Sequence, residues 1–461
     1  MRTPDHRMAA TLKRLSFGKG NINHGWTRIN TDKRRGPFLT IRTPTGDFWR
    51  RTTKALLFRS ICVHPCSSVI GIEFLRYGLG AVLALLSFPC LAAAPLDPAK
   101  LAQMDAAIER AIADRQLPGG VLWVEHNGTS YHKAFGQRAL VPKLEPMTED
   151  TIFDVASMTK VLATAPALMI LAERGKLKLD EPVATYLPGF EGGGKETITL
   201  RHLLTHMSGF NTRLSRDPDW SDHERAFALI GRERPPDPPG TVCRYSDINF
   251  IILGEVIRRV SGEMLEEVAS REIFEPLKMK DTRFLPPAAW LPRIAPTERS
   301  GREVLRGKVH DPKARRMGGV AGHAGVFTTA SDVARFARMM LNGGELDGVR
   351  VLKPESVKLM TRVQTPASIQ ARRGLGWDID SAYSRPRGDV FPIGSYGHTG
   401  FTGACLWIDP FSKTFWMLLS NRVHPEPSGN IYALQKSLAT LAAQAVTDFD
   451  FQNVPGTAQV P

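Results

Sequence analysis

Ser157 and Lys160 have the residue types and the spacing of a nucleophile and its helper. Positions i and i+3 share one face of a helix, so the lysine amine can reach the serine hydroxyl. An unassisted serine is a weak nucleophile, and lysine can take its proton only if burial or a nearby cation lowers the lysine pKa. This S-x-x-K pattern alone is weak evidence, because Ser16 and Lys19 also fit it. The alternative is a serine that caps a helix, with a surface lysine one turn later.

Two further motifs follow at distant positions. Tyr245 opens the triplet YSD, 88 residues after Ser157 and just before a predicted helix. His398 opens the triplet HTG, 153 residues beyond Tyr245 and at the end of a predicted strand. The alternative for Tyr245 is a core tyrosine whose hydroxyl finds a buried partner. The order of the three motifs carries more weight than any one of them.

Taken in order, these motifs resemble the serine β-lactamase and penicillin-binding-protein superfamily, whose class C branch carries S-x-x-K, Y-x-N and K-T-G. The resemblance covers about residues 100–445. It implies that Ser157 is the acylated nucleophile, that Lys160 keeps it activated, and that Tyr245 is a second proton-transfer group serving the leaving group and deacylation. It also implies an oxyanion hole and a substrate-binding strand beside the cleft. The implied oxyanion donors are the backbone N–H groups of Ser157 and Phe401, and the implied substrate-binding residues are Asp247, His398, Thr399 and Gly400.

Two of these positions depart from the class C pattern. Asp247 stands where the pattern has Asn, so an acid replaces the amide that would hold a substrate amide. His398 replaces a lysine, which is a permanent cation suited to a substrate carboxylate, whereas histidine is mostly neutral at pH 7. Phe401 is also bulky beside the nucleophile. These changes argue against efficient β-lactam hydrolysis and resemble esterases and peptidase-like members.

We therefore expect a serine hydrolase that acts through an acyl-enzyme on esters or D-amino-acid peptide amides. The alternatives are a true β-lactamase or D-alanyl-D-alanine carboxypeptidase and, in another class, an inactive penicillin-binding or receptor-like protein. The expected partner is a small-molecule ester or a peptidoglycan-like peptide, with no cofactor. A nucleic-acid partner is disfavoured, because residues 1–94 hold 15 Lys or Arg against 4 Asp or Glu while the rest holds 45 against 42. The net charge of +14 therefore belongs mainly to the N-terminal segment.

The elements that must position these residues are read from periodicity. Residues 97–116, 157–174, 247–260, 331–342 and 430–446 have helical patterns. Residues 120–136 read as two strands around a turn at Asn127-Gly128, and residues 403–409 and 414–420 read as two more. We predict an α/β (α+β) fold of the β-lactamase/transpeptidase type. An antiparallel sheet from both chain ends is flanked by the terminal helices, and a mostly helical lobe is inserted.

A glycine-rich stretch at residues 310–336 predicts close backbone approach or special turns near the cleft. It looks like a segment of low-molecular-weight penicillin-binding-protein relatives. His310, Asp311 and His323 have the residue types of metal ligands, but their spacing matches no zinc motif. We expect structural histidines and no metal. The segment THMSG at 205–209 also resembles the family, and we assign it no chemistry. The glycines of the stretch at residues 310–336 are Gly318, Gly319, Gly322 and Gly325.

The N-terminal region predicts export. Residues 77–89 are an apolar run too short to span a bilayer, preceded by Arg76 and followed by small residues, as in a secretory signal peptide. We expect residues 1–68 to be a basic extension outside the translated protein and 69–94 to be the signal peptide, with a transit peptide or a buried core helix as alternatives. The mature protein would be periplasmic or secreted, without a stable membrane span. The hydrolase domain would cover 95–450 (α/β lobe about 95–155 and 375–450, helical lobe about 157–370), and 451–461 a tail.

Two cysteines lie in the predicted mature chain, Cys243 and Cys405. They are far apart in sequence and form no metal-binding pattern. Buried free thiols are the simplest interpretation. A disulfide between them is the alternative if the protein lies in an oxidising compartment.

Overall fold

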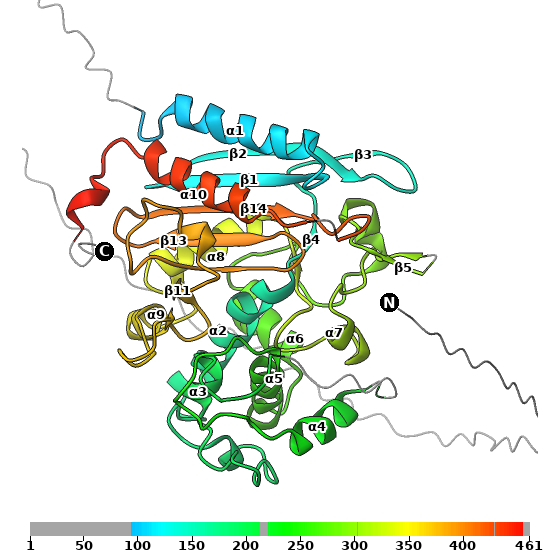
Figure 1. The fold of residues 1–461 in the computed structure, drawn as a ribbon, viewed down its shortest axis with the longest axis vertical. Helices are drawn as coiled ribbons and strands as arrows, with labels where there is room; N and C mark the ends of the chain where they lie inside the picture. Colours follow the sequence, from blue (N-terminus) through cyan, green and yellow to red (C-terminus); the bar gives the residue numbers. More distant parts are fainter. Residues whose placement is uncertain (1–93, 213–219, 221, 302, 428, 455–461) are drawn as a thin grey trace, which may run out of the picture. The chain divides into compact units, whose positions relative to one another are not determined.

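The computed structural model describes residues 94–454 apart from 213–219, 221, 302 and 428. The predicted extension and signal peptide at residues 1–93 lie outside the described residues, as does the tail from residue 455. Within the described part, an eight-stranded sheet runs in the order β10-β11-β12-β13-β14-β1-β2-β3 (Figure 1), and the strand pairs are antiparallel. Its strands are β1 Gly119–His126, β2 Thr129–Ala139, β3 Glu145–Pro146, β10 Arg372–Arg373, β11 Asp378–Asp380, β12 Tyr396–Thr399, β13 Cys405–Asp409 and β14 Thr414–Ser420.

Strand β1 from one end of the chain pairs with β14 from the other, which confirms the predicted fold class. The predicted hairpin is also present, since β1 and β2 are joined at Asn127 and Gly128, both with positive φ. Strand β14 matches the predicted range, whereas β13 begins two residues later than expected. Both β13 and β14 are buried along their whole length. A sheet covered on both faces explains why these strands read as continuous apolar runs.

Helices cover both faces of this sheet (Figure 1). Helices α1 (Pro98–Ala113) and α10 (Tyr432–Ala445) pack together over one face, where they enclose a core that includes Leu122, Trp416 and Leu418. Helix α8 (Ala330–Leu341) packs on the other face, against β1, β13 and β14. The three helices lie where the apolar periodicity predicted them, with ends shifted by a few residues.

A second, larger core lies among the remaining helices and the α8 face of the sheet. Its centre is the segment that carries the S-x-x-K motif. The predicted regular helix at 157–174 instead begins with a 3₁₀ turn at Ala156–Met158 and a π turn at Lys160–Thr164, before α2 at Ala165–Glu173. The other helices are α3 Leu200–Leu204, α4 His223–Arg232, α5 Asp247–Ser261, α6 Leu265–Ala269 with a π turn at Ser270–Phe274, α7 Pro312–Arg316 and α9 Pro354–Thr361.

Short elements complete the described part. The predicted strand before Ser157 is reduced to β4 (Phe153–Asp154), which pairs with β7 (Phe327–Thr328). Two more two-stranded sheets join β5 (Arg299–Ser300) to β6 (Glu303–Val304) and β8 (Glu345–Leu346) to β9 (Val349–Arg350). Single 3₁₀ turns occur at Val183–Thr185, Ala288–Arg293, Arg385–Arg387 and Phe451–Asn453.

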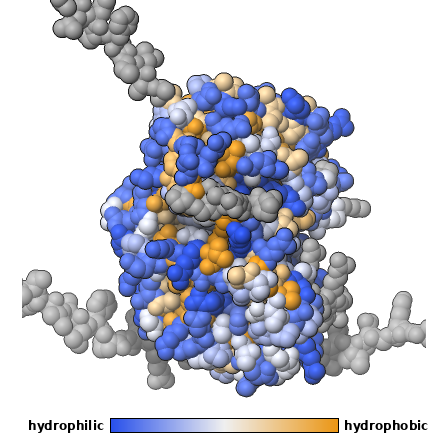
Figure 2. Space-filling view, turned by 60° about the vertical axis from the view of Figure 1, so that its left-hand side comes forward, coloured by the Kyte–Doolittle hydropathy of each residue, from blue (hydrophilic) through white to orange (hydrophobic). Residues whose placement is uncertain are grey.

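One segment in the described residues is long and apolar enough to cross a membrane by length and composition, namely Ala156–Glu173. Because 83% of this window is buried inside the protein, we interpret it as a core helix. The face shown in Figure 2 is mostly hydrophilic, and its hydrophobic residues form small, separate patches. Cys243 and Cys405 are both free thiols; Cys405 is buried as expected, whereas Cys243 is only half-buried.

Candidate active site

Ser157 sits in the tight turn between β4 and the π turn, with its side chain partly exposed. The residue before it, Ala156, has a φ of +46°, a conformation that is uncommon for residues other than glycine. This turn is held by Asp154, whose Oδ1 accepts a hydrogen bond from the Ala156 N–H at 2.8 Å. Strained backbone of this kind is typical of functional turns. Here it presents the Ser157 hydroxyl at the start of the helix.

Lys160 lies directly behind that hydroxyl, as the helical spacing predicted. Its Nζ donates to Ser157 Oγ at 3.0 Å, to Asp247 Oδ1 at 2.9 Å and to the backbone oxygen of His323 at 3.1 Å. The side chain is fully buried. An ammonium group has three donors, and three acceptors are present. The site is therefore shaped for the charged form of this lysine.

The charge state of Lys160 differs from what the motif led us to expect. A lysine base needs a lowered pKa, and burial does lower the pKa of Lys160. The Asp247 carboxylate and the Tyr245 phenol outweigh burial, and the net pKa lies above the usual lysine value. A lysine that stays charged cannot take the Ser157 proton. It can hold the hydroxyl in place and stabilise the alkoxide that forms when another group removes the proton.

Asp247 is turned towards this lysine. It was expected among the substrate-binding residues, and in the structure its Oδ1 pairs with Lys160. Burial raises the pKa of Asp247. The neighbouring charges of Lys160 and His323 lower this pKa by more than burial raises it, so the net pKa lies below the usual aspartate value. The substitution of Asp for the Asn of the class C pattern therefore places a carboxylate against the ammonium group.

Tyr245 lies between two cations at the start of α5. The Lys160 Nζ is 5.0 Å from the centre of its ring, and the Arg373 guanidinium carbon is 5.5 Å away. The rings of His206 and His398 lie at 4.5 and 6.0 Å. Cations beside an aromatic ring are attracted to its face. The Tyr245 ring is thus packed against the same ammonium group that donates to Ser157.

His398 occupies the position expected from the third motif, at the end of β12 near Tyr245. Burial, together with the charges of Lys160 and Arg373, lowers the pKa of His398 to about 3, so the ring is neutral at pH 7. Its Nδ1 lies 2.8 Å from the backbone oxygen of Thr399, which assigns the proton to Nδ1. The Nε2 then carries a lone pair and can accept a hydrogen bond, but it offers no positive charge to a carboxylate.

The turn after β12 reaches the residues that precede the nucleophile. A Cβ atom on Gly400 would come within 2.3 Å of the Val155 oxygen, so only glycine fits there. Thr402 Oγ1 donates to the Asp154 oxygen at 2.7 Å. These contacts place the turn that contains Phe401 beside the residues that precede Ser157, and the role of the Phe401 N–H as an oxyanion donor stays a prediction. The Phe401 side chain is 53% exposed and packs against the His310 ring and the Arg422 guanidinium.

The backbone of the glycine-rich stretch packs between α5 and the helical segment that begins at Ser157. The Gly322 oxygen accepts a hydrogen bond from Thr164 Oγ1 at 2.7 Å. A Cβ atom on Gly322 would come within 2.0 Å of the Phe250 oxygen. The Val326 N–H donates to Thr159 Oγ1 at 3.1 Å. The predicted close backbone approach is confirmed at Gly322, and it explains how the His323 oxygen reaches Lys160.

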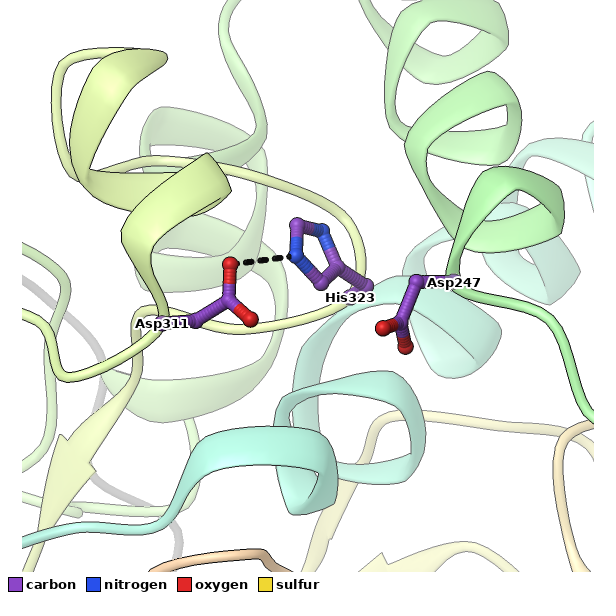
Figure 3. Close-up of side chains that lie close together, drawn as sticks. All are labelled: Asp247, Asp311 and His323. Carbon is purple, nitrogen blue, oxygen red and sulfur yellow. Dashed lines mark hydrogen bonds and ion pairs between the residues drawn. The ribbon is translucent and has the colours of Figure 1, made fainter. Parts of the chain in front are cut away.

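Asp247, Asp311 and His323 converge at this point (Figure 3), with one potential ligand atom from each within 4.8 Å of the other two. Their types suit a divalent cation. The cation that Asp247 faces, however, is the Lys160 ammonium group. His310 contributes no ligand atom to this cluster, and its ring packs against Phe401. We assign no metal to these residues.

Several contacts of the site were not foreseen. His206, in the segment to which we assigned no chemistry, lies against the Tyr245 ring and hydrogen-bonds the Ser246 N–H through Nδ1. Arg373 is buried, and its Nη1 has no partner among the described residues. The Tyr383 ring lies beside the Tyr245 ring, with the ring centres 5.3 Å apart and the planes tilted by 41°. Nothing in the local sequence marks Arg373 or Tyr383, whereas His206 belongs to a segment that already resembled the family.

A family model for β-lactamase matches residues 104–440, which is well over half of the chain. The chain belongs to the β-lactamase family. Members of this family are generally serine hydrolases. The match spans both halves of the sheet and the helical part between them, so it includes every motif of the candidate site.

Two curated relatives of this β-lactamase family protein cover similar lengths. One, from Escherichia coli K12, is named "Putative D-alanyl-D-alanine carboxypeptidase" and is 32% identical over 379 residues, 72% of this chain and 86% of that protein. The other is an N-acetylmuramyl-L-alanine amidase of Bacillus subtilis strain 168, 32% identical over 380 residues, covering 72% and 84%. A penicillin-binding protein homologue from Caulobacter crescentus has the same fold, with a TM-score of 0.62, 22% identity and coverage of 76% of this chain and 99% of that one.

Proposed function

We propose that this protein hydrolyses an amide or ester bond of a cell-wall peptide through an acyl-enzyme on Ser157. The observation that carries the proposal is the hydrogen bond from the buried Lys160 ammonium group to Ser157 Oγ, with Tyr245 against the same ammonium group. Both curated relatives described above carry names of enzymes that cleave amide bonds of peptidoglycan-type peptides. That supports a peptide amide over a simple ester as the substrate class.

The geometry favours Tyr245 as the group that moves the proton. Tyr245, which lies against Lys160 and Arg373, receives the proton of Ser157 as Oγ attacks the carbonyl carbon and relays a proton onward. The backbone N–H groups of Ser157 and Phe401 stabilise the oxyanion. The phenol then gives its proton to the leaving amine, which departs and leaves the acyl-enzyme. A water molecule, deprotonated by Tyr245, attacks the acyl carbon, and the proton returns to Ser157 Oγ as the acid product leaves.

Slow β-lactam turnover is expected from the same site. His398 is neutral at pH 7, so the strand offers no positive charge at the position where the class C pattern has a lysine. Penicillin is therefore expected to label Ser157 faster than it is hydrolysed. Rapid turnover of nitrocefin would instead favour a true β-lactamase. Absence of labelling by both a fluorescent penicillin and a fluorophosphonate would favour an inactive, receptor-like protein.

The compartment follows from this proposal. Peptidoglycan lies outside the cytoplasmic membrane, and residues 77–89 have the pattern of a signal-peptide core. We therefore propose a periplasmic or secreted mature protein. N-terminal sequencing of the natural protein tests this, and a mature start before residue 60 would contradict it.

The test of the activity is replacement of Ser157 by Ala. The variant should lose turnover of a p-nitrophenyl ester and of a muramyl peptide, while it keeps the fold. Mass spectrometry after incubation with penicillin and with a panel of short-chain esters should show one adduct on the wild-type chain. Undiminished turnover by Ser157→Ala would contradict the proposal.

A further inference from the structure

A chain of polar contacts extends from the nucleophile to a histidine and a second aspartate. Lys160 Nζ lies 2.9 Å from Asp247 Oδ1, and His323 Nε2 lies 2.9 Å from Asp311 Oδ1. The facing atoms of Asp247, Asp311 and His323 are all within 4.8 Å of one another. Figure 3 shows the His323 ring turned towards Asp311, which lies at the start of α7, with Asp247 on the other side of His323 at the start of α5.

Asp311 and His323 are held firmly at their own positions. Asp311 caps α7, and its Oδ1 accepts hydrogen bonds from the N–H groups of Lys313 and Ala314 at 2.9 and 2.8 Å. The neighbouring His310 N–H donates to Asp154 Oδ2 at 2.6 Å, which ties this segment to the turn before Ser157. His323 is 1% exposed and belongs to the glycine-rich stretch that packs between α5 and the helical segment of Ser157. Neither side chain needs to move to support the site.

His323 contacts the site in two independent ways. Its backbone oxygen accepts a hydrogen bond from Lys160, and its ring hydrogen-bonds the half-buried Asp311 close to the half-buried Asp247. Two carboxylates this close, without a donor between them, would each oppose ionisation of the other. Burial raises the pKa of Asp311, but the charge and the hydrogen bond of His323 lower it, and the net pKa lies well below the usual value. The ring therefore lets Asp247 and Asp311 be ionised together.

We propose that His323 and Asp311 are positioning residues of this hydrolase, which hold Asp247 ionised opposite Lys160 and so fix Lys160 as the ammonium donor to Ser157. The inference rests on the proposed function, because Ser157 must be the nucleophile for this chain of contacts to matter. Neither residue touches the reacting atoms. Their effect reaches the nucleophile through Asp247 and Lys160.

Other titratable groups face this network and bear on any pH dependence. Asp154 and His310 lie beside Asp311, and their own charges interact with one another. His206 and Arg373 lie beyond Tyr245, where both Lys160 and Arg373 lower the pKa of the buried His206, after burial itself. The groups that face the network are Asp154, Lys160, His206, Tyr245, Asp247, His310, Asp311, Arg373 and His398.

The experiment measures how fast a fluorophosphonate labels Ser157 between about pH 3 and pH 9, which covers the acid limb set by Asp247 and requires no knowledge of the natural substrate. The variants are His323→Ala, His323→Gln and Asp311→Asn. The matched control is His132→Ala, which removes a histidine that pairs with Glu149 at 2.8 Å on the surface of β2, away from the site. The melting temperature of each variant is recorded alongside.

The His323→Ala and Asp311→Asn variants are expected to shift the pH profile of labelling in opposite directions. Loss of the ring in His323→Ala leaves two carboxylates facing each other, so Asp247 ionises at higher pH and the acid limb of the labelling rate moves upward by about one pH unit. Asp311→Asn removes a negative charge that raises the pKa of Asp247, so the acid limb moves downward. Labelling by His323→Ala should be slower by about 10- to 100-fold at pH 7. His323→Gln can still donate to Asp311 and should recover most of that rate.

Wild-type labelling kinetics in His323→Ala would overturn the inference, as would equal slowing of all three variants without a change in the pH profile. If His323→Ala fails to fold, His323→Gln and Asp311→Asn decide the question, because both keep the side-chain volume. A wild-type protein that is not labelled on Ser157 would remove the proposed function and this inference together. Labelling on Ser157 without any pH shift in the variants would remove this inference alone.

Discussion

The protein has one core under α1 and α10 and another behind Ser157, and the two differ in the polarity of the side chains that they enclose. Under α1 and α10 the side chains are apolar, and the polar atom of Trp416 is satisfied by the Pro386 oxygen at 2.9 Å. Behind Ser157, the fully buried Lys160 forms a charged pair with the half-buried Asp247. Burying charges costs solvation energy that the pair only partly recovers, whereas apolar burial stabilises the fold. The first region therefore serves stability, and the second keeps charges that chemistry needs.

Replacement of Ser157 should separate the two regions most sharply. We expect Ser157→Ala to lower kcat/KM for a p-nitrophenyl ester by about 10³-fold or more, because the variant has no nucleophile. The free energy of unfolding should hardly change, since the side chain is partly exposed. Steady-state kinetics test the loss of activity, and urea unfolding tests the unchanged stability. Retained turnover would place the chemistry elsewhere.

Trp416→Ala should give the reverse result. The side chain is fully buried between the sheet and α10, so its loss should lower the free energy of unfolding by about 3–5 kcal/mol. Activity per folded molecule should be nearly unchanged, as measured at low temperature and corrected for the folded fraction. A specific loss of activity without loss of stability would break the division between the two cores.

Asp247→Asn tests the charged pair directly. Because the Asp247 carboxylate raises the pKa of Lys160, its removal should lower that pKa, and the alkaline limb of the pH–rate profile should move to lower pH. We expect kcat/KM at pH 7 to fall by about 10- to 100-fold, since the ammonium group loses the partner that positions it. A profile identical to wild type would mean that the pair is structural.

His398→Gln should have a smaller effect. The pKa of His398 is lowered to about 3, so the ring carries no charge between pH 5 and 8 and the shape of the pH–rate profile in that range should not change. Glutamine keeps an acceptor in its amide oxygen but not its position, so the rate should fall by no more than about 10-fold. A limb near pH 6 that disappears in the variant would show that His398 titrates there.

Reducing agent should have the smallest effect. Cys243 and Cys405 are free thiols, so dithiothreitol should leave the melting temperature within about 1 °C, where loss of a disulfide would lower stability by roughly 2–4 kcal/mol. A clear drop in melting temperature would reveal a disulfide, and thiol titration of the denatured protein provides an independent count.

Local patterns predicted the fold better than they predicted the site. The hairpin at Asn127 and Gly128, strand β14 and the helices at both chain ends follow from periodicity and turn residues. The i,i+3 contact of Lys160 with Ser157 follows from helix geometry. The charge of Lys160 depends on Asp247, 87 residues away, so the motif alone suggested a base where the structure shows an ammonium donor.

Contacts between distant segments explain the remaining differences. Nothing near Arg373 in the sequence shows that it lies against Tyr245. The glycines around His323 did signal close approach, but which backbone they approach is fixed only by the packing of α5 and the nucleophile helix. The irregular helix start at Ser157 also results from tertiary packing, because the local sequence is compatible with a regular helix.

The most direct test of the central claim is to map the site of covalent labelling. The wild-type protein would be incubated with a fluorophosphonate, digested and analysed by peptide mass spectrometry. The account predicts a single adduct on the Ser157 side chain, absent from the Ser157→Ala variant. An adduct on any other residue, or none at all on a folded protein, would contradict it.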